Sequence, residues 1–148
     1  MEKSQIKEFL KGAKKTAVIG IGSELRADDW AGCLISEGLK TKKADVYTSE
    51  TTPENFVFAS DCSHVILIDA AHLSQPPGSI GYFEDPSIIG ETNTHKATTL
   101  FMKYLKNSGC RTLLIAIEPQ NLEFGGEMSQ AVKKAAERVK KELEEALN

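Results

Sequence analysis

Acidic and imidazole side chains lie next to the expected strand ends in this 148-residue sequence. Asp28 and Asp29 begin the helix expected after the first apolar strand, and Asp69 closes the third strand. His72 and His95 lie in the segments that follow. Two carboxylates and an imidazole at one edge of a sheet would form an oxygen-rich site with open coordination positions. Such a site fits hard or borderline divalent cations, for example nickel, iron, zinc or manganese.

The three aspartates differ in how well a purely structural role explains them. Acids at a helix start commonly cap the helix and interact favourably with the positive end of its dipole, which is a sufficient role for either Asp28 or Asp29. The other aspartate can then point into a cleft. Asp69 ends a run of Val, Ile and Leu, where a buried carboxylate needs a partner or a cation. Asp69 is therefore the stronger functional candidate.

The sequence contains three histidines, and they are not equally placed for a site at the strand ends. His64 begins its strand and is expected at the opposite edge, so it is removed from the candidates. An ordinary loop role is open to both His72 and His95. Position along the chain leaves these two as candidates.

The elements that must position these residues alternate between strand and helix. Apolar runs predict strands at residues 16–21, 44–48, 64–69, 79–83 and 112–117. Apolar residues at helical spacing, together with Pro53 as a helix start, predict helices at residues 6–10, 31–39 and 53–58, from 94 or 95 to 105, and at 132–143. The unbroken apolar run at 64–69 is typical of a strand covered on both faces in the middle of a parallel sheet.

This order of elements predicts an α/β fold, a three-layer αβα sandwich around a mostly parallel sheet of about five strands. We expect a single domain over residues 1–148 with right-handed crossovers. Ligands of such sheets bind beyond the carboxyl ends of the strands. The segments beginning at Gly20, Asp69 and Glu118 all follow apolar strands and should meet at that edge.

Composition excludes several classes of function. A net charge of −3 and a pI of about 5.7 leave no basic footprint for nucleic acid. No apolar run reaches the roughly 18 residues of a membrane span, and the first residues lack the apolar stretch of a signal peptide, so we expect a cytoplasmic protein. The three cysteines form no C-x-x-C pair, which disfavours a disulfide framework or a zinc knuckle.

Common catalytic motifs are missing from the sequence. It contains neither the H-E-x-x-H of zinc peptidases nor the G-x-S-x-G of a nucleophile elbow. The loop after the first strand has Leu25 where a dinucleotide-binding motif needs its third glycine, and it lacks the Gly-Lys pair of a P-loop. The residues alone therefore predict an α/β domain with a metal or acidic site.

Residues 20–32 read Gly-Ile-Gly-Ser-Glu-Leu-Arg-Ala-Asp-Asp-Trp-Ala-Gly. This segment resembles the opening motif of the hydrogenase maturation endopeptidases, G-[IV]-G-N-x-L-x-x-D-[DE]-x-x-G. The resemblance continues through residues 52–55, 67–70, 94–95 and 117–120 in the family's order. Only the N-terminal helix lies outside it.

The resemblance implies an endopeptidase that removes the C-terminal extension of a nickel-iron hydrogenase large-subunit precursor after nickel insertion. It implies that Asp29, Asp69 and His95 contact nickel, supplied by the precursor itself, and that they carry the reaction. It therefore selects His95 over His72. Asp28, Gly22 and Ser23 match positions that shape the loop.

Two departures from the family pattern are present. Ser23 replaces the usual asparagine and keeps a short hydrogen-bonding side chain. Thr48-Ser49-Glu50-Thr51 replaces the frequent Asp-Gly-Gly-[ST], and the loss of the glycines predicts a differently shaped substrate groove. The sequence resembles most closely the branch of this family that serves formate-linked or energy-converting hydrogenases.

Several mechanisms and functions stay open at this point. The metal could be a recognition element, a Lewis acid or an activator of water, or the carboxylates could act as acid and base as in aspartic peptidases. A metal-responsive chaperone that binds the precursor without cutting it would use the same three residues. A metabolic hydrolase or a nucleotide-binding domain on the same architecture is a third possibility.

Overall fold

The computed structural model describes residues 4–85 and 96–148, and within them a five-stranded sheet in the order β2-β1-β3-β5-β4. The strands are β1 (Thr16–Ile21), β2 (Asp45–Glu50), β3 (His64–Ala70), β4 (Ile80–Phe83) and β5 (Arg111–Ile117). Strand β4 pairs antiparallel with β5, and the other pairs are parallel. The predicted α/β fold with a mostly parallel sheet is confirmed.

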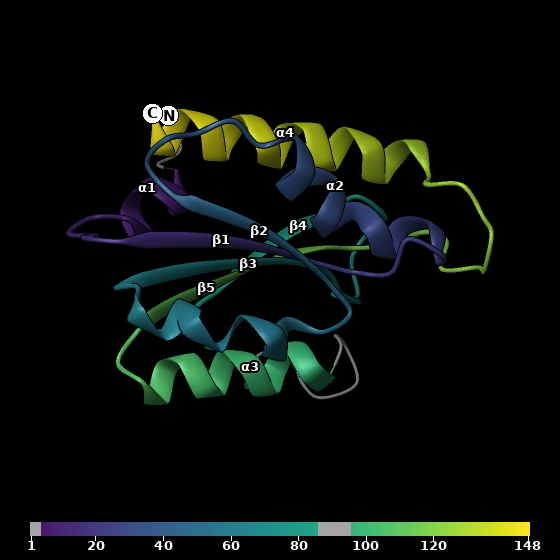
Figure 1. The fold of residues 1–148 in the computed structure, drawn as a ribbon. Coiled ribbons are helices and arrows are strands. Elements are labelled where there is room, and N and C mark those ends of the chain that lie inside the picture. Colours follow the sequence, from purple (N-terminus) through teal and green to yellow (C-terminus); the bar gives the residue numbers. More distant parts are fainter. Residues whose placement is uncertain (1–3, 86–95) are drawn as a thin grey trace.

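Helices cover both faces of the sheet (Figure 1). One layer contains α1 (Gln5–Phe9), α2 (Ala31–Gly38) and α4 (Gln130–Leu147). The other contains α3 (Lys96–Asn107) and the 3-10 helix η2 (Pro53–Asp61). A second 3-10 helix, η1 (Ala27–Trp30), leads into α2. Among the described residues, no helix is both long and apolar enough to cross a bilayer.

The core is divided in two by the sheet because successive strand residues point to opposite faces. Ile66 and Ile68 of β3 belong to the apolar cluster under α1, α2 and α4. Val65 and Leu67 belong to the cluster under α3 and η2. Every residue of β3 is buried, which confirms the expectation that this strand is covered on both faces.

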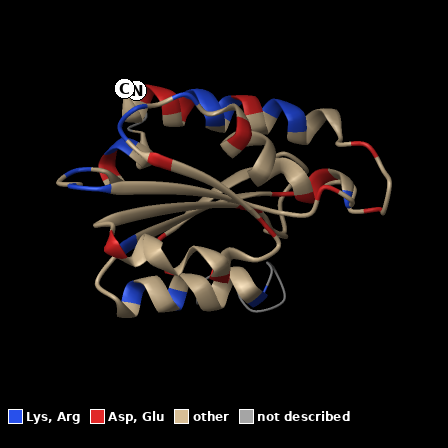
Figure 2. Cartoon of the chain, viewed as in Figure 1, with Lys and Arg blue, Asp and Glu red and all other residues tan. Residues whose placement is uncertain are grey.

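The last helix separates its apolar and charged faces. Its buried residues recur at helical spacing along one side: Val132, Ala135, Ala136, Val139, Leu143 and Leu147. Lys, Arg and Glu occupy most of the other positions of α4, while the strands carry few charges (Figure 2). The helix begins after Ser129, whose hydroxyl accepts a hydrogen bond from the Val132 amide. It extends beyond the predicted 132–143 at both ends, and the buried Leu147 continues the apolar face by one more turn.

The amino-terminal edge of the sheet contains a buried imidazole. His64 is 5% exposed, and its ring packs edge-on against Phe9, with centroids 5.2 Å apart. Its Nδ1 lies 2.9 Å from the Ser63 hydroxyl, and no described residue bonds to Nε2. Burial lowers the pKa of His64 below its usual value, and the nearby Arg111 cation lowers it further.

We therefore expect the folded protein to lose stability in acid through His64. The native state disfavours the proton that an unfolded histidine accepts below pH about 6.5, so the free energy of unfolding should fall as the pH decreases from about 7 to 5. In the His64→Leu variant this pH dependence should be weaker, as measured by urea unfolding at each pH. Phe58→Leu, a change at an exposed residue that does not titrate, is the control and should leave the slope unchanged. An equal slope in His64→Leu and the wild type would contradict this assignment.

Candidate functional site

Three parallel strands end together at one edge of the sheet. Strands β1, β3 and β5 are neighbours, with Gly20 paired to Ile68 and Ala70 paired to Ile117. The expected meeting of the segments that follow them is therefore confirmed. This carboxyl edge carries Asp29 from η1, Asp69 from β3 and Glu118 after β5.

Asp69 is fully buried near the end of β3. One carboxylate oxygen accepts a hydrogen bond from the Ala70 amide at 2.8 Å. The other accepts from the Thr98 hydroxyl of α3 at 2.9 Å. A buried carboxylate needs hydrogen-bond donors, and the first turn of α3 supplies one of them. Asp69 therefore lies on the α3 side of the sheet.

Asp29 is 3% exposed and lies in η1. Its Oδ2 accepts a hydrogen bond from the Ser23 amide at 2.9 Å. Since η1 follows β1 and lies against the neighbouring β3, Asp29 and Asp69 approach the carboxyl edge from adjacent strands. The structure therefore places two of the predicted site residues at the same edge of the sheet.

Glycine permits this close arrangement of η1, α2 and the strands. A Cβ on Gly22 would overlap the carbonyl oxygen of Asp29. A Cβ on Gly32 would overlap the carbonyl oxygen of Ile68. The backbones can approach at both places only because the side chain is absent. The glycines of the opening motif therefore bring the two aspartate-bearing segments together.

Asp28 has a different role from its neighbour. Its fully buried carboxylate accepts hydrogen bonds from the amides of Gln120, Asn121 and Ser129 at 2.7–2.8 Å, and from the Ser129 hydroxyl at 2.9 Å. It caps neither η1 nor α2, so the capping role considered from the sequence is wrong. Asp28 instead fastens the loop between β5 and α4 to the opening motif.

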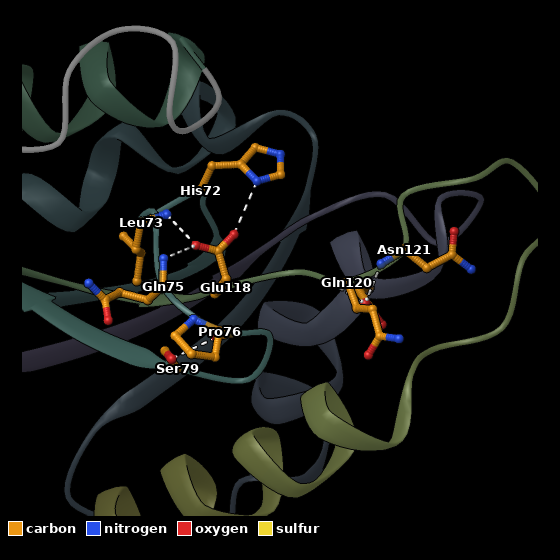
Figure 3. Close-up of polar contacts among 9 residues, drawn as sticks. His72, Leu73, Gln75, Pro76, Ser79, Glu118, Gln120 and Asn121 are labelled. Carbon is orange, nitrogen blue, oxygen red and sulfur yellow. Dashed lines mark hydrogen bonds and ion pairs between the residues drawn. The ribbon is translucent and has the colours of Figure 1, made fainter.

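Glu118 anchors another loop at the same edge (Figure 3). Its Oε1 accepts hydrogen bonds from the amides of Leu73 at 2.6 Å and Gln75 at 3.2 Å. Its Oε2 lies 3.1 Å from Nδ1 of His72. Glu118 was expected at this edge, but it was not among the predicted site residues. Its position could have marked it as a candidate, because an acid next to the end of a buried strand is the pattern that singled out Asp69.

The segment that departs from the family pattern keeps an unusual backbone. Glu50 has φ +56°, a left-handed conformation that side chains disfavour and glycine adopts readily. Its carbonyl accepts a hydrogen bond from the Gly22 amide at 2.8 Å, and the neighbouring Ser49 hydroxyl donates to the Gly20 carbonyl at 3.1 Å. The ladder to β1 holds Glu50 in this conformation.

Glycine at position 50 should therefore stabilise the protein. We expect Glu50→Gly to raise the free energy of unfolding by about 1 kcal/mol. Glycine avoids the steric cost that a side chain pays in the left-handed conformation, and this gain should exceed the loss from the greater entropy of glycine in the unfolded chain. Denaturant unfolding measures the change. Glu54→Gly is a matched control at an exposed acid in η2 and should destabilise. A loss of stability in Glu50→Gly would show that this residue is not strained.

His95, the third predicted site residue, lies outside the described residues. Among the described residues, no group of three or more histidines, cysteines or acids could hold a metal ion. The predicted ligand set of Asp29, Asp69 and His95 therefore stays a prediction. Ser23, the other departure from the family motif, uses its backbone amide to hold Asp29 and its hydroxyl to accept from the Leu25 amide at 3.3 Å.

Several known proteins with a similar sequence or fold are named as hydrogenase maturation proteases or endopeptidases. A family model described as hydrogenase maturation protease matches residues 34–146. A relative from Methanocaldococcus jannaschii, named "Putative hydrogenase maturation protease", is 24% identical over 139 residues, and the match covers 82% of each chain. The crystal structure of the [NiFe] hydrogenase maturation protease HycI from Thermococcus kodakarensis is similar, with a TM-score of 0.81 and 23% identity over 96% of this chain and 97% of that one.

A second solved structure, the endopeptidase HycI from Escherichia coli, has a TM-score of 0.78 and 25% identity, and the match covers 88% of this chain and 90% of that one. The family model includes Asp69 and Glu118 but begins after Asp29. It spans well over half of the chain, and the structural likeness extends through both layers of helices. The chain is therefore a peptidase that belongs to the hydrogenase maturation protease family.

Proposed function

We propose that this peptidase removes the C-terminal extension of a nickel-iron hydrogenase large-subunit precursor after nickel has been inserted. The observation that carries the proposal is the approach of two buried carboxylates, Asp29 and Asp69, to the carboxyl edge from adjacent strands. Buried acids at that edge are costly unless they serve a partner or a cation. Membership of a protease family favours cleavage over the alternative, a chaperone that binds without cutting.

Nickel fits the chemistry of the residues present. Carboxylate oxygens and an imidazole suit a borderline divalent cation, so Asp29, Asp69 and His95 would contact nickel already held by the precursor. The metal would position the scissile peptide bond, and a divalent ion can also polarise its carbonyl or activate water. In this scheme only a nickel-loaded precursor would place its extension correctly at the carboxyl edge.

The test is the intact mass of a nickel-loaded large-subunit precursor from the same source. The precursor is incubated with the wild-type protein and, separately, with the Asp29→Ala variant. Loss of one defined C-terminal peptide with the wild type alone supports the proposal. A stable complex with unchanged mass would favour the chaperone, and other precursors would then be tested.

Two finer points rest on the sequence alone. Service of a formate-linked or energy-converting hydrogenase stays a prediction from the family resemblance. The cytoplasmic location also stays a prediction.

A further inference from the structure

His72 and Glu118 lie at the ends of neighbouring strands. Strand β3 pairs with β5 up to Ala70 and Ile117. The pairing continues one step further, because the Ala71 amide donates a hydrogen bond to the Ile117 carbonyl at 3.0 Å. His72 and Glu118 follow Ala71 and Ile117 directly in the chain, just beyond the ends of the two strands. They are therefore part of the carboxyl edge that carries Asp29 and Asp69.

Glu118 also shares a face of the sheet with Asp69. Strand residues alternate between faces, and Leu114 and Ala116 of β5 lie in the apolar cluster under α3. Glu118 continues that series, and Leu73, whose amide it binds, packs against the same cluster. Asp69 is paired with Ala116, so Glu118 lies one strand over and two residues along. Strand geometry separates their Cα atoms by about 8 Å, so the two acids lie in the same part of the carboxyl edge.

The contacts fix how the imidazole is presented (Figure 3). The Glu118 side chain is only 7% exposed, and its Oε1 is held by two backbone amides. Its Oε2 is directed at Nδ1 of His72. A carboxylate only accepts hydrogen bonds, so in neutral His72 the hydrogen resides on Nδ1 and the lone pair on Nε2. The His72 side chain is 58% exposed, so a protein substrate can reach its ring.

We propose that His72 is a catalytic base in the cleavage reaction and that Glu118 is its positioning residue. This inference rests on the proposed function. Nε2 of His72 takes a proton from water as the water oxygen bonds to the scissile carbonyl carbon. The same proton then passes to the leaving amine nitrogen as the carbon–nitrogen bond breaks. Glu118 keeps the imidazole in the required tautomer and stabilises the imidazolium formed between the two transfers.

Two variants separate these roles. His72→Gln removes the base at an exposed position where folding should tolerate the change. In Glu118→Gln, the side-chain oxygen can still accept from the Leu73 and Gln75 amides, while the new NH2 group faces Nδ1 of His72. That donor forces the imidazole into the opposite tautomer, with its hydrogen on Nε2. Glu123→Gln is the matched control, because Glu123 is an exposed acid in the same loop between β5 and α4.

The experiment measures kcat and KM for precursor cleavage together with the ring tautomer of His72. Long-range nitrogen–proton NMR spectra report the tautomer, and the signals absent from His72→Gln identify this ring among the histidines. We expect the Nδ1–H form in the wild type and the Nε2–H form in Glu118→Gln. Both variants should lose at least about 100-fold in kcat with little change in KM, whereas Glu123→Gln should match the wild type.

The outcomes that overturn the inference differ from those that overturn the proposed function. No cleavage by the wild type would overturn the function and this role of His72 together. Wild-type cleavage with an unchanged kcat in His72→Gln would overturn the role of His72 alone. An Nε2–H tautomer in the wild type, or a rise in KM without a fall in kcat, would show that His72 is not a base.

Discussion

Asparagine at position 69 is expected to reduce the rate of precursor cleavage about 100- to 1000-fold while the protein stays folded. The substitution removes the negative charge that Asp69 offers to a metal or to the reacting atoms, but it changes the shape of the side chain very little. Its oxygen can still accept from the Ala70 amide. The Thr98 hydroxyl can accept from the new NH2 group, because a hydroxyl both donates and accepts.

Cleavage is measured by intact mass over time, and folding by the thermal midpoint. Asp45→Asn is a suitable control, because Asp45 is an exposed acid at the start of β2, away from the carboxyl edge of the sheet. It should cleave at the wild-type rate. Equal rates for Asp69→Asn and the wild type would remove Asp69 from the mechanism. A collapse of the thermal midpoint in Asp69→Asn would instead assign the carboxylate to folding.

The second large effect is on stability. Asp28→Ala should lower the free energy of unfolding by about 3–5 kcal/mol. The change removes the acceptor of all the hydrogen bonds that tie Gln120, Asn121 and Ser129 to the opening motif. It leaves backbone donors without a partner in a partly buried loop. For a chain of this size the thermal midpoint should fall by about 10 °C.

Calorimetry and denaturant unfolding would both measure this loss. Asp28→Asn is the informative companion, since it keeps one oxygen as an acceptor and should lose less stability than alanine. Asp45→Asn again controls for the removal of a single negative charge. If Asp28→Ala unfolds at the wild-type midpoint, the loop between β5 and α4 does not depend on this carboxylate.

The features predictable from the sequence are those fixed by local pattern. The apolar run at 64–69 predicted β3, and the structure extends it by only one residue, to Ala70. The helix expected at 53–58 is the longer 3-10 helix η2, with a kink at Phe56. The spacing of the apolar residues in this short segment does not distinguish an α-helix from a 3-10 helix.

Asp28 shows why part of the site was not predictable. Its partners lie 92 to 101 residues further along the chain, so a rule about neighbouring residues assigned it to a helix start. Glu118 could have been recognised, because the argument applied to Asp69 holds equally for an acid after the buried run at 112–117. The contact of Glu118 with His72 is also distant in sequence, and only the paired strands reveal it.

The segment from Glu118 to Asn121 links the two loops of the carboxyl edge, since Glu118 binds residues 72–75 and the amides of Gln120 and Asn121 bind Asp28. Amides bonded to buried carboxylates exchange their hydrogens slowly, even where the backbone is irregular. These loops should therefore exchange with deuterium at rates close to those of the central strands. Their conformational entropy is already lost on folding, so substrate binding does not have to order them.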